Sequence, residues 1–290
     1  MLAAPASADV LGEAPSYATR ALTDVPNAAA IRERIWSPRL SDGWVPQGVA
    51  VGEGFLWVAA YQSRDPRQNR GPCRVFKIDP SDGGIAGQFD LPRECGHAGG
   101  IAHTGDRYLY VADTGHLFRI DTQAALAAGH CEPLGCTVME LHGELRGSAI
   151  AYRSGVLWFA PYRKAGAGTA RLWRVSENEI LAAITRGGGT FDESSAHRAG
   201  PIADQTQGAA IAADESIWLT QSSGQFGRLQ KVDPSSGAVI ASYTMPAGIE
   251  DIEFAPDGRL WAVSEAGSQR WYAWRTFFPV VFSLDLAALR

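Results

Sequence analysis

The stretch Gln47-Gly48-Val49-Ala50-Val51, which a short turn joins to Leu56-Trp57-Val58, decides the fold because the chain repeats its pattern four more times. Each copy opens with a polar residue, continues through small and alternating apolar residues, and reaches a second strand led by an aromatic residue. The further copies are residues 97–101 with 109–111, 146–150 with 157–159, 207–211 with 217–219, and 250–254 with 260–262. Repetition at roughly fifty residues is typical of repeat architectures.

A third strand follows in every copy, and a weaker fourth strand follows in four of them. The third strands are residues 75–79, 117–121, 172–176, 229–233 and 281–285, and the fourth strands are residues 85–91, 137–141, 180–185 and 239–245. Turn sequences such as Asp79-Pro80-Ser81-Asp82-Gly83 separate third from fourth strands, as hairpins require. Four antiparallel strands repeated around an axis make a β-propeller. The sequence therefore predicts an all-β, five-bladed β-propeller, with a six-bladed ring as the alternative.

The fifth copy reaches Arg290 without a fourth strand. Residues 31–36 alternate polar and apolar side chains and have no other partner in the repeat, so we expect them to supply this strand and close the ring. Closure of this kind removes an exposed sheet edge. We therefore expect one propeller domain over residues 31–290, preceded by an extension at residues 9–30.

The composition excludes several functional classes. The chain is 46% hydrophobic and 20% charged, which is enough to bury a core and argues against disorder. Lys and Arg number 26 against 31 Asp and Glu, a net charge of −5, and no basic cluster stands out. This balance argues against a nucleic-acid or anionic-membrane surface, and no apolar run is long enough for a transmembrane helix. We expect a monomer that binds a small molecule or a peptide.

The N-terminus and the cysteines indicate export. Ala6-Ser7-Ala8 has the small-x-small form that signal peptidase cuts, so residues 1–8 are interpreted as the remnant of an export signal or a tag, or else as an Ala-rich tail. The four cysteines lack the Cys-x2-Cys spacing of a zinc ribbon. In a secreted or periplasmic protein we expect disulfides, with Cys73 paired to Cys95 and Cys131 to Cys136.

Alignment of the repeats predicts a ring of polar side chains at the mouths of the innermost strands. Small neighbouring residues are expected to leave room there for a ligand, although a ring that merely solvates a water-filled channel is the alternative. The long loops are predicted to gather on the same face, which marks it as the working face. The ring consists of Gln47, His97, Arg146, Gln207 and Glu250, and a second tier at the ends of the second strands adds Tyr61, Asp113, Tyr162, Gln221 and Glu265.

These residue types suggest specific roles. A histidine such as His97 titrates near neutral pH. The Asp251 carboxylate lies beside Glu250 in the sequence and, when ionised, would raise the pKa of Glu250. His97 and Glu250 are therefore the candidate catalytic groups for proton transfer. Arg146 is predicted to bind a carboxylate or phosphate.

Gln47 and Gln207 can orient an amide or hydroxyl. Calcium could take oxygens from some of a set of residues that comprises Glu250, Asp251, Asp113, Gln47 and Gln207, but Arg146 in the same ring would repel the ion. We therefore expect no metal and no cofactor.

The segment 267–278 places five aromatic residues and two arginines on the same predicted face. Such a cluster most often buries itself, here across the junction between the fifth and first repeats. The alternative is that it stacks on a ligand or gates the channel.

Two family resemblances follow from the repeat. Gly99-Gly100-Ile101-Ala102 with residues 109–115, and residues 257–262, resemble blades of the gluconolactonase, NHL and strictosidine-synthase-like propellers. Pro46-Gln47-Gly48 and Thr206-Gln207-Gly208 are similar to the Thr-Gln-Gly opening motif of the plant-type glutamine cyclotransferases, a resemblance that implies a substrate amide held by Gln47.

The sequence therefore predicts a secreted propeller that binds a small polar or anionic ligand in an axial pocket. A lactonase-like hydrolase is the first hypothesis for its activity. A glutaminyl cyclotransferase-like acyltransferase and a non-catalytic binding or interaction scaffold are the alternatives.

Overall fold

The computed structural model describes residues 10–131, 135–187, 189–224 and 226–290. The expected export remnant at residues 1–8 lies outside the described residues. No helix in the described ranges is long and apolar enough to cross a membrane.

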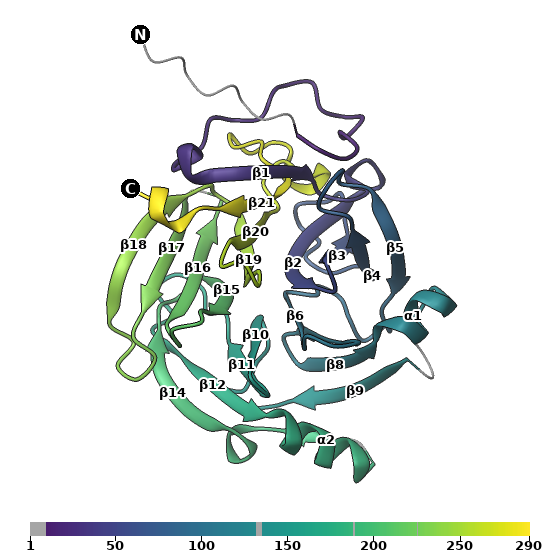
Figure 1. The fold of residues 1–290 in the computed structure, drawn as a ribbon, viewed down its shortest axis with the longest axis vertical. Helices are drawn as coiled ribbons and strands as arrows, with labels where there is room; N and C mark the ends of the chain where they lie inside the picture. Colours follow the sequence, from purple (N-terminus) through teal and green to yellow (C-terminus); the bar gives the residue numbers. More distant parts are fainter. Residues whose placement is uncertain (1–9, 132–134, 188, 225) are drawn as a thin grey trace.

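Five β-sheets stand around a common axis, and the predicted five-bladed propeller is confirmed (Figure 1). Each blade contains four antiparallel strands, which are named below from the innermost to the outermost. Blade 1 is β2 (Trp44–Gly52), β3 (Phe55–Gln62), β4 (Cys73–Ile78) and β5 (Ile85–Asp90). Blade 2 is β6 (Gly100–His103), β7 (Tyr108–Asp113), β8 (His116–Asp121) and β9 (Cys136–Leu141), to which the two-residue β13 (Thr190–Phe191) adds in parallel.

The other three blades follow the same order. Blade 3 is β10 (Ala149–Arg153), β11 (Val156–Ala160), β12 (Ala170–Ser176) and β14 (His197–Ile202). Blade 4 is β15 (Thr206–Ile211), β16 (Ile217–Ser223), β17 (Phe226–Val232) and β18 (Val239–Met245). Blade 5 is β19 (Ile249–Phe254), β20 (Leu260–Ser264), β21 (Val280–Leu284) and β1 (Ile31–Trp36).

The N-terminal strand closes the ring, as predicted. β1 pairs antiparallel with β21, with Ile31 opposite Leu284 and Trp36 opposite Val280. Figure 1 shows β1 lying along the outside of blade 5, so strands from the two ends of the described chain share one sheet. Opening the ring would therefore require separating a full ladder of backbone hydrogen bonds.

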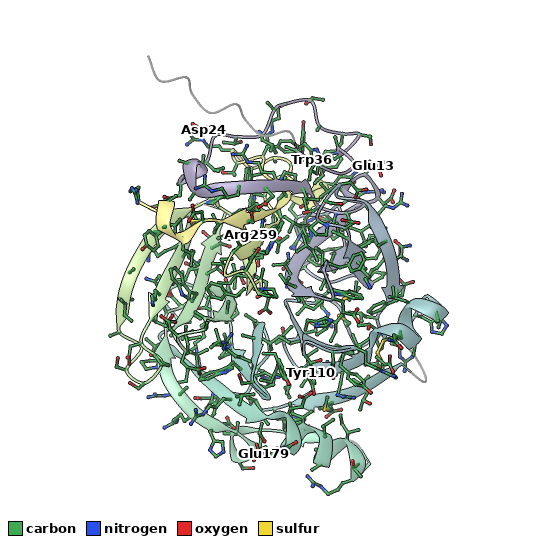
Figure 2. All side chains as sticks on the ribbon, viewed as in Figure 1. Glu13, Asp24, Trp36, Tyr110, Glu179 and Arg259 are labelled. Carbon is green, nitrogen blue, oxygen red and sulfur yellow. A yellow bond between two sulfur atoms is a disulfide. The ribbon has the colours of Figure 1, made fainter. Side chains whose placement is uncertain are left out.

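One predicted strand is a helix. Residues 180–185 belong to α2 (Glu177–Thr185), and β14 is the outer strand of blade 3 instead. Ser176 and Glu179 form a capping box in which each side chain bonds the backbone N–H of the other residue, and this motif starts the helix. The label of Glu179 in Figure 2 marks this helix at the outside of the ring. A shorter helix, α1 (Thr122–Ala128), starts at the Asp121 cap in blade 2.

Short 3-10 helices join other elements. They are η1 (Ala28–Ala30), η2 (Leu40–Asp42), η3 (Glu193–Ser195), η4 (Gln269–Trp271) and η5 (Leu286–Ala288).

The structure confirms one of the two predicted disulfides. Cys131 and Cys136 are bonded, with their Cα atoms 5.0 Å apart. The predicted Cys73–Cys95 bond is wrong, because both residues are free thiols in the structure. Each is 2% exposed within the apolar core between blades 1 and 2, and burial raises the pKa of the Cys73 thiol. A buried, protonated thiol is a poor partner for disulfide exchange.

Aromatic side chains of the second strands pack in the hydrophobic clusters between blades, as predicted. The five are all at most 8% exposed, namely Trp57, Tyr110, Trp158, Trp218 and Trp261. Their role is packing.

Three glycines of the inner strands lie where neighbouring blades approach each other most closely. A Cβ atom at Gly48 would lie 2.8 Å from Ile101 Cγ2, one at Gly100 would lie 2.6 Å from the Ile150 nitrogen, and one at Gly208 would lie 2.6 Å from Asp251 Cα. These glycines are therefore needed so that neighbouring inner strands can approach one another around the axis.

We predict that Gly208→Ala lowers the free energy of unfolding by about 2 to 3 kcal/mol, because backbone atoms of blade 5 occupy the space of the new methyl group. Urea denaturation measures this loss. Gly115→Ala is the control, since its methyl group would lie 3.3 Å from the end of the Arg146 side chain and at an ordinary contact distance of 3.9 Å from the Leu141 carbonyl oxygen. An equal loss in both variants would contradict the axial close-approach explanation.

Candidate axial site

Backbone irregularities direct the polar ring residues toward the axis. The pairing register shifts between Pro46 and Gly48 in β2 and between Thr206 and Gly208 in β15. It shifts again in β19, between Ile249 and Ile252. β-bulges re-aim the side chains at which they occur. The bulged residues include Gln47, Gln207 and Glu250, three members of the predicted ring.

A cavity of about 370 Å³ opens on this face of the ring. Seven of the residues predicted from the sequence line it, namely Gln47, His97, Asp113, Tyr162, Gln207, Glu250 and Glu265. The fivefold arrangement therefore brings together residues that lie more than two hundred positions apart in the chain.

Four predicted site residues do not line the cavity. The Arg146 guanidinium turns away and donates to the carbonyl oxygens of Leu141, at 3.2 Å, and Gly143, at 3.1 Å, so its predicted anion-binding place at the axis is wrong. Its position precedes β10, where the loop geometry directs the side chain toward blade 2. The Gln221 amide donates to the Asp204 carbonyl at 2.7 Å.

The other two of the four have structural positions beneath the cavity. Asp251 is fully buried, and its Oδ2 accepts a hydrogen bond from the Ile101 backbone N–H at 3.1 Å, which ties blade 5 to blade 2. Tyr61 is fully buried and its ring stacks on His97, with centroids 4.6 Å apart.

Glu250 and Glu265 form a carboxyl pair in the cavity wall. They are only 2% and 8% exposed, respectively. Gln207 Nε2 lies 3.4 Å from Glu250 Oε1, and Gln47 Nε2 donates to Glu265 Oε2 at 2.9 Å. Each acid is thus oriented by a glutamine of another blade.

Burial and mutual repulsion shift the titration of this pair. Burial raises the pKa of Glu250 well above its ordinary value, and the charge of Glu265 raises it further. Burial raises the pKa of Glu265 to about 7, while Gln47 and the nearby Trp271 side chain hold it from rising further. The indole N–H of Trp271 lies near this carboxyl without meeting hydrogen-bond geometry. Near neutral pH the pair therefore holds at least one proton that it can transfer.

His97 is the second titratable group of the cavity. Burial lowers the pKa of its imidazole, and its Nδ1 lies 2.6 Å from the Asn69 carbonyl oxygen. Because a carbonyl only accepts, Nδ1 carries the proton in the neutral ring and Nε2 keeps its lone pair. The ring can therefore act as a base.

Asp113 holds the wall beside His97. Its Oδ2 accepts from the Gly96 backbone N–H at 2.7 Å and lies 3.4 Å from the guanidinium of Arg70. The carboxylate therefore binds together the loop before β6 and the loop before β4.

Sequence reasoning missed several residues that line the cavity. They are Asn69, Arg70, Gly99, Thr114, Ser148, Lys164, Arg270 and Trp271. Most stand on loops outside the repeat, so alignment of the strands could not place them. The arginine and aromatic content of residues 267–278 was the available signal for Arg270 and Trp271.

The segment 267–278 is partly buried, as predicted, and it also lines the cavity. Phe277 and Phe278 are buried, and Trp274 stacks on Trp271 at 4.5 Å between centroids, with Trp271 facing the cavity. The N-terminal extension covers the segment, since Arg20 donates to the carbonyl oxygens of Tyr272 and Trp274 at 2.8 Å.

Among the described residues, no three His, Cys, Asp or Glu side chains come together as a metal site. Asp251, which the sequence offered as a calcium ligand, faces the backbone of blade 2.

The comparisons with known proteins concern the fold. No protein-family model and no curated protein matches the chain. Similar solved structures include the glutaminyl cyclase of Myxococcus xanthus, with a TM-score of 0.55, 14% identity, and coverage of 88% of this chain and 94% of that one. Another is the PQQ-bound aldose sugar dehydrogenase of Streptomyces coelicolor, with a TM-score of 0.52, 12% identity, and coverage of 90% and 98%. At such identities the similarity shows a shared β-propeller fold.

We predict that Glu265→Gln stabilises the protein at neutral pH. Between the ordinary pKa of 4.5 and about 7, the unfolded chain releases the Glu265 proton while the folded protein keeps it. The free energy of unfolding therefore falls as pH rises through this window. The variant lacks this fall, so at pH 7.5 its free energy of unfolding should exceed that of the wild type by on the order of 1–3 kcal/mol.

Thermal or urea unfolding at several pH values between 4 and 8.5 measures this difference. Glu253→Gln is the matched comparison, because burial raises the pKa of Glu253 to about 8. The increase in the free energy of unfolding that this substitution causes should therefore keep growing with pH up to about 8. If the difference in the free energy of unfolding between Glu265→Gln and the wild type does not change with pH, the Glu265 carboxyl is ionised in the folded protein across this range.

Proposed function

We propose that the axial cavity binds a small amide substrate and catalyses an intramolecular acyl transfer in it by general acid–base chemistry. The specific reaction that we propose is cyclisation of a glutamine bearing a free amino group, with release of ammonia. The observation that carries this proposal is the Glu250–Glu265 pair, two buried carboxyls that line one cavity and have raised pKa values, so that at least one of them is protonated near neutral pH. The fold shared with a glutaminyl cyclase supports the choice of reaction.

The pair suits both proton transfers of this reaction. Ionised Glu265 accepts a proton from the substrate amine as its nitrogen attacks the side-chain amide carbon. Protonated Glu250 donates a proton to the departing nitrogen, the old carbon–nitrogen bond breaks, and ammonia leaves as the lactam forms. Catalytic groups work best with pKa values near the working pH, which burial provides here.

The neighbouring side chains orient the reactants. Gln47 and Gln207 hold the two carboxyls and present further amide groups to a substrate carbonyl. His97 Nε2 is a second base on the same wall. This chemistry requires no metal or cofactor.

The proposal includes a secreted or periplasmic location. The Cys131–Cys136 disulfide supports it, because such bonds persist in oxidising compartments. We also propose that the protein acts as a monomer, since all of the carboxyl, glutamine and histidine groups come from one chain.

We predict that the wild-type protein releases ammonia from L-glutamine and from glutaminyl dipeptides, and that Glu250→Gln and Glu265→Gln each lower kcat by about 10²- to 10⁴-fold, as loss of a general acid or base does. Coupled ammonia detection and mass spectrometry of the lactam measure both products. The wild-type rate should rise as Glu265 ionises around pH 7 and fall at higher pH as Glu250 loses its proton.

Glu253→Gln is the matched control, because it removes another β19 carboxyl with a raised pKa, one that is partly exposed and is not part of the cavity wall. Its activity should equal that of the wild type. Turnover of lactones but not of glutaminyl substrates would favour a lactonase-like hydrolase instead. Ligand binding without turnover of either class would favour a non-catalytic scaffold.

A further inference from the structure

Arg270 is a buried cation beside the axial cavity. The residue is 6% exposed and lines the cavity at the 3-10 helix η4. Its terminal nitrogens donate to the Tyr61 hydroxyl and, at 3.2 Å, to the Pro66 carbonyl, and both acceptors are neutral. Its Nε is buried without a hydrogen-bond partner. Across the described part of the chain, no carboxylate lies within ion-pair distance of it.

A buried charge without a counterion is costly, so its presence calls for an explanation. Burial lowers the pKa of the guanidinium only to about 10, which leaves the group charged at neutral pH. Packing also fixes the group in place, because it stacks over the ring of Trp271 at 4.2 Å and over that of Tyr61 at 5.4 Å. A fixed, desolvated guanidinium with free N–H groups is the arrangement that binds a carboxylate in two-pronged fashion.

Cations and carboxyl groups share the wall of the cavity around Arg270. Trp271 contacts the guanidinium with its ring face and has its indole near the Glu265 carboxyl. Lys164 and Arg70 add positive charge to the cavity wall, and Lys164 has no ion-pair partner within the described ranges. A ligand in the cavity can therefore contact both carboxyl groups and cations.

We propose that Arg270 is the receptor for a carboxylate of the ligand. The ligand is then a small molecule that joins an amide and an amine to a free carboxylate, such as an amino acid or a dipeptide, and not the end of a long polypeptide. The identification of the amide and amine rests on the proposed function, whereas the carboxylate subsite rests on Arg270 itself. The cavity volume of about 370 Å³ agrees with a ligand of this size.

Two unreactive probes isolate the carboxylate. L-Pyroglutamate and 2-pyrrolidinone share one lactam ring and differ only in that group, and calorimetry measures their affinities for the wild-type protein. We expect pyroglutamate to bind at least about tenfold more tightly, as a charge-assisted hydrogen bond provides. Arg270→Met should abolish the difference, and Arg270→Lys should restore part of it.

Arg74→Met is the matched control. Arg74 also stacks on a tryptophan ring, that of Trp44 at 4.8 Å, but it pairs with Asp90 and is not part of the axial cavity wall. Its removal should leave both affinities unchanged. Thermal unfolding establishes whether each variant is folded. If Arg270→Met is not folded, the affinities of the wild-type protein and of Arg270→Lys for pyroglutamate and pyrrolidinone test the carboxylate receptor.

A third probe separates this proposal from the proposed reaction. Glutarate carries carboxylates and no amide, so its binding should depend on Arg270 even if glutaminyl substrates are never turned over. Equal binding of pyroglutamate and pyrrolidinone, glutarate binding that survives Arg270→Met, or no binding of any probe would overturn the carboxylate receptor. Tighter Arg270-dependent binding of inorganic phosphate than of either carboxylate would assign the subsite to phosphate instead.

Discussion

The close approach of the five inner strands around the axis is the constraint on which the rest of the structure depends. Gly48, Gly100 and Gly208 permit it because a side chain at any of these positions would overlap the next blade. The last sheet of the ring is completed at its outer edge by β1, which pairs with β21. Closure of the ring and the geometry of the axial cavity therefore both depend on the close approach of the inner strands.

That geometry determines the electrostatics of the cavity. Bulges in β2, β15 and β19 bring polar residues toward an axis that is largely shielded from water, so Glu250 retains its proton at higher pH than an exposed acid. Asp251, the next residue, is also buried but accepts a backbone hydrogen bond from Ile101 and serves the ring itself. The two adjacent acids thus have different environments, because Glu250 lines the cavity and Asp251 lies between blades 5 and 2. Retaining such buried acids lowers stability, which is a common feature of functional sites.

The failures of sequence reasoning have local causes. Residues 180–185 were expected to form a fourth strand, but the Ser176–Glu179 capping box starts a helix there, and blade 3 takes its outer strand from residues farther along. Arg146 shares a repeat position with Gln47, yet it stands on a loop before its strand and bonds to carbonyls of blade 2. Cys73 and Cys95 were expected to bond because both lie near one rim, whereas the structure buries them as thiols.

The sequence by itself determined the number of blades, the closing strand, the aromatic packing between blades and seven of the residues that line the cavity, because all of these follow from periodicity at the strand level. Only the tertiary structure decided which side chains share the cavity, since loops outside the repeat place Arg270, Trp271 and Arg70 there. Burial decided the protonation of Glu250 and Glu265 in the same way, because the pKa of a carboxyl depends on neighbours that are distant in the chain.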